Sequence, residues 1–172
     1  HSHRRGPYAN GAIVVPVKAS ETLFGGLEKQ RSLEKAAFEC GGKNYTAPAQ
    51  SIKAFIEGKL DSSPLSSTTY PCGLLPSNLH EWFDKEIAES LAEGFLNFEK
   101  KIPGFIKEGL IIAPETRTSS PLRIPRHPET LESLNTRGLF LLGEGAGYSG
   151  GIVTSAADGM RFAYRAKLSE KF

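Results

Sequence analysis

The sequence has few of the features that mark membrane, disulfide-rich or nucleic-acid-binding proteins. No run of about 18 apolar residues occurs, so we expect no membrane-spanning helix. The two cysteines, Cys40 and Cys72, form no C-x-x-C pair, and we expect idle or buried thiols in a reducing cytoplasm. The net charge is +2 with both signs interspersed, which gives no reason to expect a nucleic-acid partner. We therefore expect a soluble cytoplasmic domain whose 172 residues are enough to bury a core.

The motifs of several large enzyme classes are also absent. No cluster of His, Cys and Asp has the spacing of a metal site, and neither a P-loop nor a nucleophile elbow occurs. His80 and His127 stand alone in the sequence, and an isolated histidine is more often structural or exposed than catalytic. Hydrolase, kinase and metalloenzyme functions therefore have no residues to support them, and we expect no metal ligand.

The chain opens abruptly at His1-Ser-His-Arg-Arg, and its only methionine is Met160. The opening has no apolar run, so it predicts neither a signal peptide nor an anchor. We expect His1 and His3 to be exposed ends or a tag remnant rather than metal ligands. We also expect the chain to be a fragment of a longer protein.

Apolar periodicity predicts an α+β fold with a helical block in the middle of the chain. The clearest signal is a helix over 84–102, where apolar residues recur every three or four positions from Ile87 to Ile102. We expect this face to pack on a core rather than on a membrane or a partner. The other elements expected before residue 109 are a strand at 12–17, a helix at 27–40 preceded by the cap Ser20, a short helix at 49–58, a loop at 61–73 and a helical region capped by Ser77.

After residue 108 the pattern changes to short apolar runs. The run Leu139-Phe-Leu-Leu142 does not alternate, which is typical of a strand buried on both faces of a parallel sheet. The elements expected here are a strand at 109–113, an extended segment at 121–125, a turn or one helical turn at 128–133, a strand at 139–142 and a helix from Gly150 onward.

A glycine-dense turn joins this last apolar run to the final helix. Five of the nine residues from 143 to 151 are glycine, and Gly145, Gly147 and Gly150 satisfy the G-x-G-x-x-G spacing. Strand, glycine turn and helix start, in that order, make a dinucleotide-binding element. A fingerprint that opens such a fold needs a later strand with an acidic residue for the ribose. No such strand follows here, so we expect this turn to close a dinucleotide-binding domain whose pyrophosphate site lies elsewhere.

Two segments of the sequence stand out together: Gly143-Glu-Gly-Ala-Gly-Tyr-Ser-Gly-Gly-Ile152 and, upstream, Glu115-Thr-Arg-Thr-Ser-Ser-Pro-Leu-Arg-Ile124. They resemble the C-terminal part of the FAD-dependent, or NAD(FAD)-utilising, dehydrogenase family of glutathione-reductase-like flavoproteins. The resemblance extends to Gly6-Pro-Tyr-Ala-Asn-Gly11 and to Asn44-Tyr-Thr-Ala-Pro-Ala-Gln50. It implies that the α+β chain is the last third of an α/β flavoprotein with two dinucleotide-binding-type domains.

The resemblance also implies a division of the chain and a partner chemistry. Full-length members bind FAD, with NAD(P)H as a candidate electron donor and a small molecule as substrate. The expected division is a strand segment at 1–18, a helical substrate-side domain at 19–108, returning strands and a loop at 109–137, and the closing strand and helix of the FAD domain at 138–172.

The site residues follow from the same resemblance. Glu144 stands where many of these flavoproteins have an acidic residue that hydrogen-bonds the ribityl chain. Arg117 is the candidate catalytic residue, because a guanidinium stabilises negative charge near a flavin or binds a carboxylate. Arg123 and Arg126 are weaker candidates for phosphate or substrate contact. The cofactor-binding residues expected are Thr116, Gly143, Glu144, Gly145, Ala146, Gly147, Tyr148, Gly150, Gly151 and Ile152.

Each of these interpretations has an alternative. The turn glycines are also explained by tight packing of a strand on a helix. The polar segment 115–120 is also explained as a solvated loop, and Tyr148 either stacks near the flavin or covers the helix start. For function, the alternatives to an oxidoreductase are a non-catalytic flavin- or substrate-binding module and a fragment with no activity of its own. We further expect the chain alone to self-associate through 139–142 or 111–113, because the neighbours of these strands lie in the missing part.

Overall fold

The structure is a computed structural model that describes residues 6–18, 21–112 and 114–169. The predicted helix cap Ser20, the terminal residues His1 and His3, and Ala113 of the predicted strand lie outside the described residues. The chain divides into two compact units, which we call unit 1 and unit 2. Unit 1 comprises His1–Lys18 and Arg31–Pro114, and unit 2 comprises Ala19–Gln30 and Glu115–Phe172.

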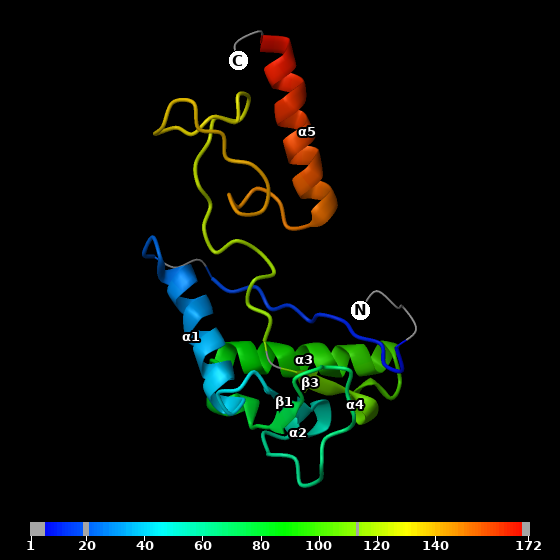
Figure 1. Cartoon of the computed structure of the whole chain (residues 1–172). Coiled ribbons are helices and arrows are strands. Elements are labelled where there is room, and N and C mark those ends of the chain that lie inside the picture. The colour runs from blue at the N-terminus through cyan, green and yellow to red at the C-terminus, as the bar shows by residue number, and fades with distance from the viewer. Residues whose placement is uncertain (1–5, 19–20, 113, 170–172) are drawn as a thin grey trace. The chain divides into compact units, whose positions relative to one another are not determined.

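Unit 1 holds most of the regular structure and confirms the predicted α+β class (Figure 1). Its three-stranded sheet has the order β2-β1-β3, with β1 parallel to β2 and antiparallel to β3. The elements in chain order are α1 (Gly25–Cys40, whose first residues belong to unit 2), β1 (Ala47–Ser51), α2 (Ile52–Ile56), β2 (Leu74–Pro76), the 3₁₀ turn η1 (Leu79–Glu81), α3 (Lys85–Lys101), α4 (Phe105–Glu108) and β3 (Leu110–Ile112).

The core of unit 1 forms where α3 packs on α2 and α4. Phe55 is fully buried at its centre, and Leu91 and Phe95 bring the apolar face of α3 against it. The predicted helices over 27–40 and 84–102 are confirmed within one or two residues of their ends, because both have a strong local apolar pattern. The predicted loop at 61–73 is confirmed as well.

Three predictions in unit 1 are wrong. Residues 12–17 form no strand, since no described strand pairs with them; Ile13 and Val15 pack on the core instead. The segment 49–58 begins as strand β1, because β2 and β3 pair with it on both sides, and only its second half is helical. Ser77 caps no helix, since it follows β2 directly and Asn78 precedes the 3₁₀ turn.

Unit 2 consists of irregular segments and the last helix, α5 (Ile152–Ser169). The predicted helix from Gly150 is confirmed, and of the turn predicted over 128–133 only residues 128–130 form a turn. The predicted strand at 139–142 is wrong: only Phe140 makes a β-bridge there, with Glu132, and Leu139 is 44% exposed. The segment 121–125, predicted to be extended, joins no strand. The predicted four-part division of the chain is finer than these two units and stays a prediction.

Candidate functional site

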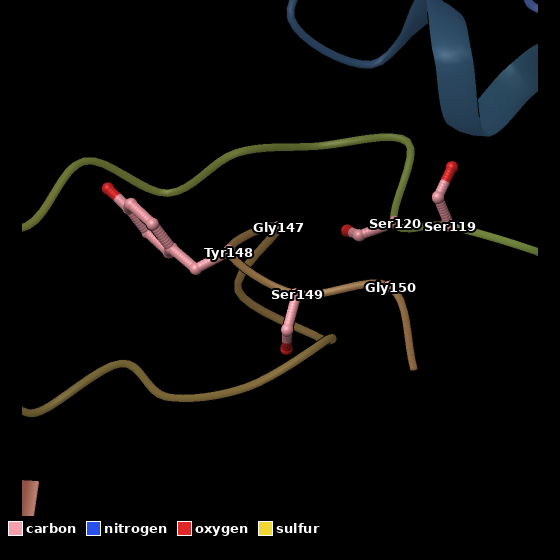
Figure 2. Close-up of a pocket in the computed structure, with 6 residues that line it drawn as sticks. All are labelled: Ser119, Ser120, Gly147, Tyr148, Ser149 and Gly150. Carbon is pink, nitrogen blue, oxygen red and sulfur yellow. The ribbon is translucent and has the colours of Figure 1, made fainter. Parts of the chain in front are cut away.

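The two sequence motifs meet within unit 2 at a pocket of about 290 Å³. One wall is Ser119–Ser120, the end of the polar segment, and the other is Gly147–Gly150 of the glycine turn (Figure 2). The Ser120 side chain points toward the turn, and its hydroxyl donates a hydrogen bond to the Gly145 carbonyl at 3.3 Å. The chain therefore brings together two segments that lie more than 20 positions apart in the sequence.

The segment that follows Ser120 runs along the turn and is hydrogen-bonded to it. The Ile124 N–H donates to the carbonyl of Ala146 at 3.1 Å, and Ala146 is 5% exposed. The single Ser120 hydroxyl proton is shared with the Leu122 carbonyl, whose oxygen is the nearer at 2.8 Å, and this contact fixes the bend between the pocket wall and this segment. The predicted cofactor residue Ala146 is thus held by backbone contacts inside unit 2.

Two kinds of glycine make up the turn. Gly143 and Gly147 have φ angles of +74° and +81°, which favour glycine, and a Cβ at Gly147 would lie 2.4 Å from the Leu122 carbonyl oxygen. At Gly145 and Gly150, in contrast, a Cβ would meet no atom within 4 Å. Tight packing therefore explains Gly147, but it does not explain Gly145 or Gly150, whose open side faces free space.

Hydrogen bonds join the start of α5 to the turn. The hydroxyls of Ser149 and Ser155 lie 2.9 Å apart, and the Thr154 hydroxyl donates to the Gly151 carbonyl at 3.0 Å. Ile152, the first helical residue and a predicted cofactor contact, is 89% exposed. The first N–H groups of a helix carry partial positive charge, so this end of α5 favours an electron-rich group nearby.

A buried ion pair lies next to the start of the turn. Arg126 donates two hydrogen bonds to the carboxylate of Asp158 on α5, at 2.7 and 2.8 Å. Hydrogen bonding by Arg126 holds the pKa of the Asp158 carboxyl below its ordinary value; burial opposes this shift, and a hydrogen bond from the Gly143 N–H adds to it. Because its guanidinium is engaged inside the unit, Arg126 is not placed as the phosphate or substrate contact expected from the sequence.

Tyr148 packs on arginine side chains. The guanidinium carbons of Arg126 and Arg123 lie 3.8 and 4.5 Å from its ring centre, distances at which cation–π attraction acts. Its ring points away from Ser119 and Ser120 (Figure 2). Neither of the two sequence interpretations of Tyr148 includes this contact with arginine.

The remaining predicted site residues lie on the surface or near it. Arg117 and Glu144 are exposed, and Thr116 is half-buried, with its carbonyl accepting a hydrogen bond from the Gln30 side chain at 2.8 Å. The Glu144 carbonyl accepts the Gly147 N–H at 2.9 Å, so its backbone shapes the turn while its carboxylate stays in solvent. The roles of Arg117, Thr116 and Glu144 toward a ligand stay predictions.

Sequence reasoning missed four residues of this region: Ser119, Ser120, Ser149 and Asp158. The three serines belong to the motifs that carry the resemblance, where charged and glycine residues give the stronger chemical signal. Asp158 had a signal of its own, since it is the single acidic residue in the alanine-rich stretch from Ile152 to Arg165.

The two histidines that stand alone in the sequence contact backbone groups of the fold. A ring nitrogen of His80 lies 2.7 Å from the Phe55 carbonyl, and His127 Nδ1 accepts N–H groups of its own turn. Cys40 and Cys72 are free thiols. Within the described ranges, no three His, Cys, Asp or Glu side chains are grouped to hold a metal ion, and no helix is long and apolar enough to cross a membrane.

Comparison with known proteins adds two findings. Residues 1–118 match the model of the family described as "FAD-dependent protein, C-terminal domain-like". The chain is also 41% identical, over 172 residues, to an uncharacterized protein of Clostridium beijerinckii. That match covers 95% of this chain but 31% of the relative, so the chain spans about a third of the length of the relative.

Proposed function

We propose that the chain is the C-terminal part of a longer FAD-dependent oxidoreductase, because it belongs to the family described as "FAD-dependent protein, C-terminal domain-like". The length of the relative supports this proposal, since the matched part is 31% of that protein. In the proposed enzyme, unit 2 supplies the glycine turn beside the flavin, and unit 1 contributes to the substrate side. The finer assignment, a dehydrogenase of the glutathione-reductase-like class acting in the cytoplasm, is part of the same proposal.

The observation that carries the proposal is the open side of the glycine turn. Gly145 and Gly150 leave free space where any side chain would project, and the adjoining pocket is lined by Ser119, Ser120 and Ser149 together with Gly147, Tyr148 and Gly150 of the turn. Hydroxyls and peptide groups both donate and accept hydrogen bonds, which suits a ring edge that carries carbonyl oxygens and nitrogens. The residues present therefore fit a flavin.

The size of the pocket limits how much of the cofactor it would hold. Its volume of about 290 Å³ is at the lower end of the range for small-molecule sites, roughly 300–1,000 Å³. We propose that it receives one end of FAD, the ring side, and that the pyrophosphate and adenine are bound by residues outside this chain. The proposal is consistent with the absence of a pyrophosphate fingerprint followed by a ribose-binding strand in the sequence.

FAD would supply the redox chemistry, the transfer of a hydride or electron pair, and the protein would orient the ring and adjust the charge around it. The N-terminal end of α5, next to Gly150 and Gly151, would favour negative charge on the ring edge. Arg117 would add a positive charge from the segment 115–120. The electron donor would be NAD(P)H, and the substrate a small molecule.

Flavin titration tests this proposal. The 172-residue chain is titrated with FAD while flavin fluorescence is followed, and the longer protein is purified and its flavin content measured. We expect stoichiometric flavin in the longer protein and no saturable binding to the chain alone at low micromolar concentration, because the pyrophosphate contacts are missing. A longer protein without flavin would refute the proposal. Flavin without any turnover of reduced nicotinamide or small-molecule substrates would favour the non-catalytic binding module.

A further inference from the structure

The ion pair of Arg126 and Asp158 joins two parts of unit 2 that are 32 positions apart in the sequence. The two side chains are 5% and 10% exposed, and both carboxylate oxygens are used in a bidentate arrangement. Pairs of this kind are geometrically specific, because the planar guanidinium fixes the direction of both hydrogen bonds. The pair therefore sets the position of α5 relative to the segment that carries Arg126.

The same two side chains also form hydrogen bonds to the backbone where the chain enters the glycine turn. Asp158 accepts the Gly143 N–H at 2.9 Å, and Arg126 donates to the Leu141 carbonyl at 2.5 Å. Both contacts are to backbone groups at the point where the chain enters the turn. Asp158 thus links the start of the turn directly to α5.

The far end of the turn contacts the same arginine. The backbone N–H of Arg126 donates to the Tyr148 hydroxyl at 3.1 Å, and its guanidinium stacks on the Tyr148 ring. Gly145, the residue with open space beside it, lies between the two held points, Gly143 and Tyr148. One arginine and its partner therefore fix both ends of the loop that presents Gly145.

Stability alone does not explain this arrangement. Removing two charges from water is costly, and a buried ion pair is often no more stabilising than well-packed apolar residues of the same volume. Apolar residues here would leave the Gly143 N–H and the Leu141 carbonyl without these partners. The pair is instead suited to fixing one backbone conformation.

We propose that Arg126 and Asp158 are positioning residues that hold the turn from Gly143 to Tyr148 in its flavin-receiving conformation. The inference rests on the proposed function for the identity of the ligand. The geometric part, that the pair fixes the turn, concerns this chain alone. The two parts are separated by the experiments that follow.

The first experiment measures amide hydrogen exchange by NMR in the 172-residue chain and in the variants Asp158→Asn and Arg126→Lys. Asn keeps the shape of Asp but loses its charge, and Lys keeps the charge of Arg but loses the fork. We expect exchange at Gly143 to accelerate about tenfold or more in Asp158→Asn and less in Arg126→Lys. Amides of α3 should keep their protection. The matched control is Arg165→Gln, because Arg165 also lies on α5 and bonds the Pro128 carbonyl but does not touch the turn.

Unchanged exchange at Gly143 in Asp158→Asn would overturn the inference. So would equal loss of protection at Gly143 and at the fully buried Leu131, since that would indicate general unfolding of unit 2 rather than a local role. If Asp158→Asn fails to fold, Arg126→Lys decides by the same two readings.

The second experiment measures FAD dissociation from the longer protein carrying Asp158→Asn or Arg165→Gln. Weaker binding in Asp158→Asn and unchanged binding in the control support the positioning role, whereas equal affinity in all three proteins overturns it. If the unmodified longer protein binds no flavin, the proposed function fails, and the exchange experiment still decides whether the pair fixes the turn.

Discussion

Gly145 and Gly147 are two residues apart, yet they are glycines for different reasons. Gly147 has a positive φ and lies against the Leu122 carbonyl, so a larger residue there would disrupt the turn whatever it binds. Gly145 has neither constraint. Substitutions that test ligand binding therefore belong at Gly145 and Gly150, where loss of ligand is separable from loss of structure.

Arg117 is the residue from which we expect an effect on flavin chemistry. In the longer protein, Arg117→Ala should retain FAD, shift the reduction potential of the flavin to more negative values, and slow its reduction by about 10²-fold or more. The physical reason is that a guanidinium beside the ring stabilises the negative charge of the reduced form and of the transition state. Anaerobic stopped-flow reduction and dye-coupled potentiometry measure the two effects. Arg137→Ala, another exposed arginine of unit 2, is the control, and equal potentials and rates in both variants would remove Arg117 from the mechanism.

At the scale of elements, the start of helix α4 is hydrogen-bonded to a single carboxylate. Glu99 on α3 accepts the N–H groups of Gly104 and Ile106 at 2.9 and 2.7 Å, at the start of α4. The hydrogen bond from Ile106, followed by that from Gly104, lowers the pKa of Glu99 below its ordinary value of 4.5. Since the folded-state pKa is the lower one, this contribution to stability is complete above the ordinary pKa and is lost as the pH falls through the lowered value.

The variant Glu99→Gln should therefore lose part of the acid dependence of folding. Denaturant midpoints of the chain and the variant are compared at about pH 6 and about pH 3. We expect a smaller drop between the two pH values in Glu99→Gln than in the unmodified chain. Glu93→Gln, an exposed position on the same helix, should behave like the unmodified chain. Identical drops in all three proteins would show that the Glu99 contacts do not contribute to stability.

The elements differ in how far the sequence predicts them. Helix α3 is predicted almost to its ends because its signal, an apolar residue every three or four positions, is local. Strand β1 has the sequence Ala-Pro-Ala-Gln-Ser, which has little strand preference, and it forms because β2 and β3 pair with it from distant parts of the chain. The apolar run 139–142 shows the opposite error. Its sequence favours a strand, but a strand needs pairing neighbours, and the described chain gives it one bridge.

The parts of the candidate site also differ in how far the sequence predicts them. The glycine turn and the helix after it are contiguous motifs, so the sequence predicts both. The pocket wall at Ser119–Ser120 and the pair of Arg126 with Asp158 depend on residues between 20 and 35 positions apart in the sequence. Hydrogen bonds across such separations leave no periodic trace, although the lone acidic residue in the last helix was a usable hint.

For the whole molecule, the exposed side of α5 bears on association. Ile152, Val153, Met160 and Tyr164 are between 67% and 89% exposed. Apolar surface of this kind recruits partners, and we propose that the isolated chain associates with a second copy through it. The segments 139–142 and 111–112 remain further candidates, because Leu139 is 44% exposed and β3 is an edge strand.

Light scattering over a range of concentrations tests this association. We expect dimers or larger species of the unmodified chain and a shift toward monomer in Met160→Glu. Leu96→Glu changes a residue that is 47% exposed on α3 and should leave the association unchanged. A monomer at high concentration, with no binding of a dye for apolar surface, would contradict the proposal.

The central claim is that the open side of the glycine turn receives a flavin, and flavin content in valine variants of the longer protein tests it most directly. Gly145→Val and Gly150→Val place side chains in space that is otherwise free, while Gly94→Val does the same on α3, away from the turn. The account predicts that the two turn variants purify folded, by circular dichroism, but without flavin, and that Gly94→Val purifies with the normal amount. Normal flavin content in both turn variants would contradict it.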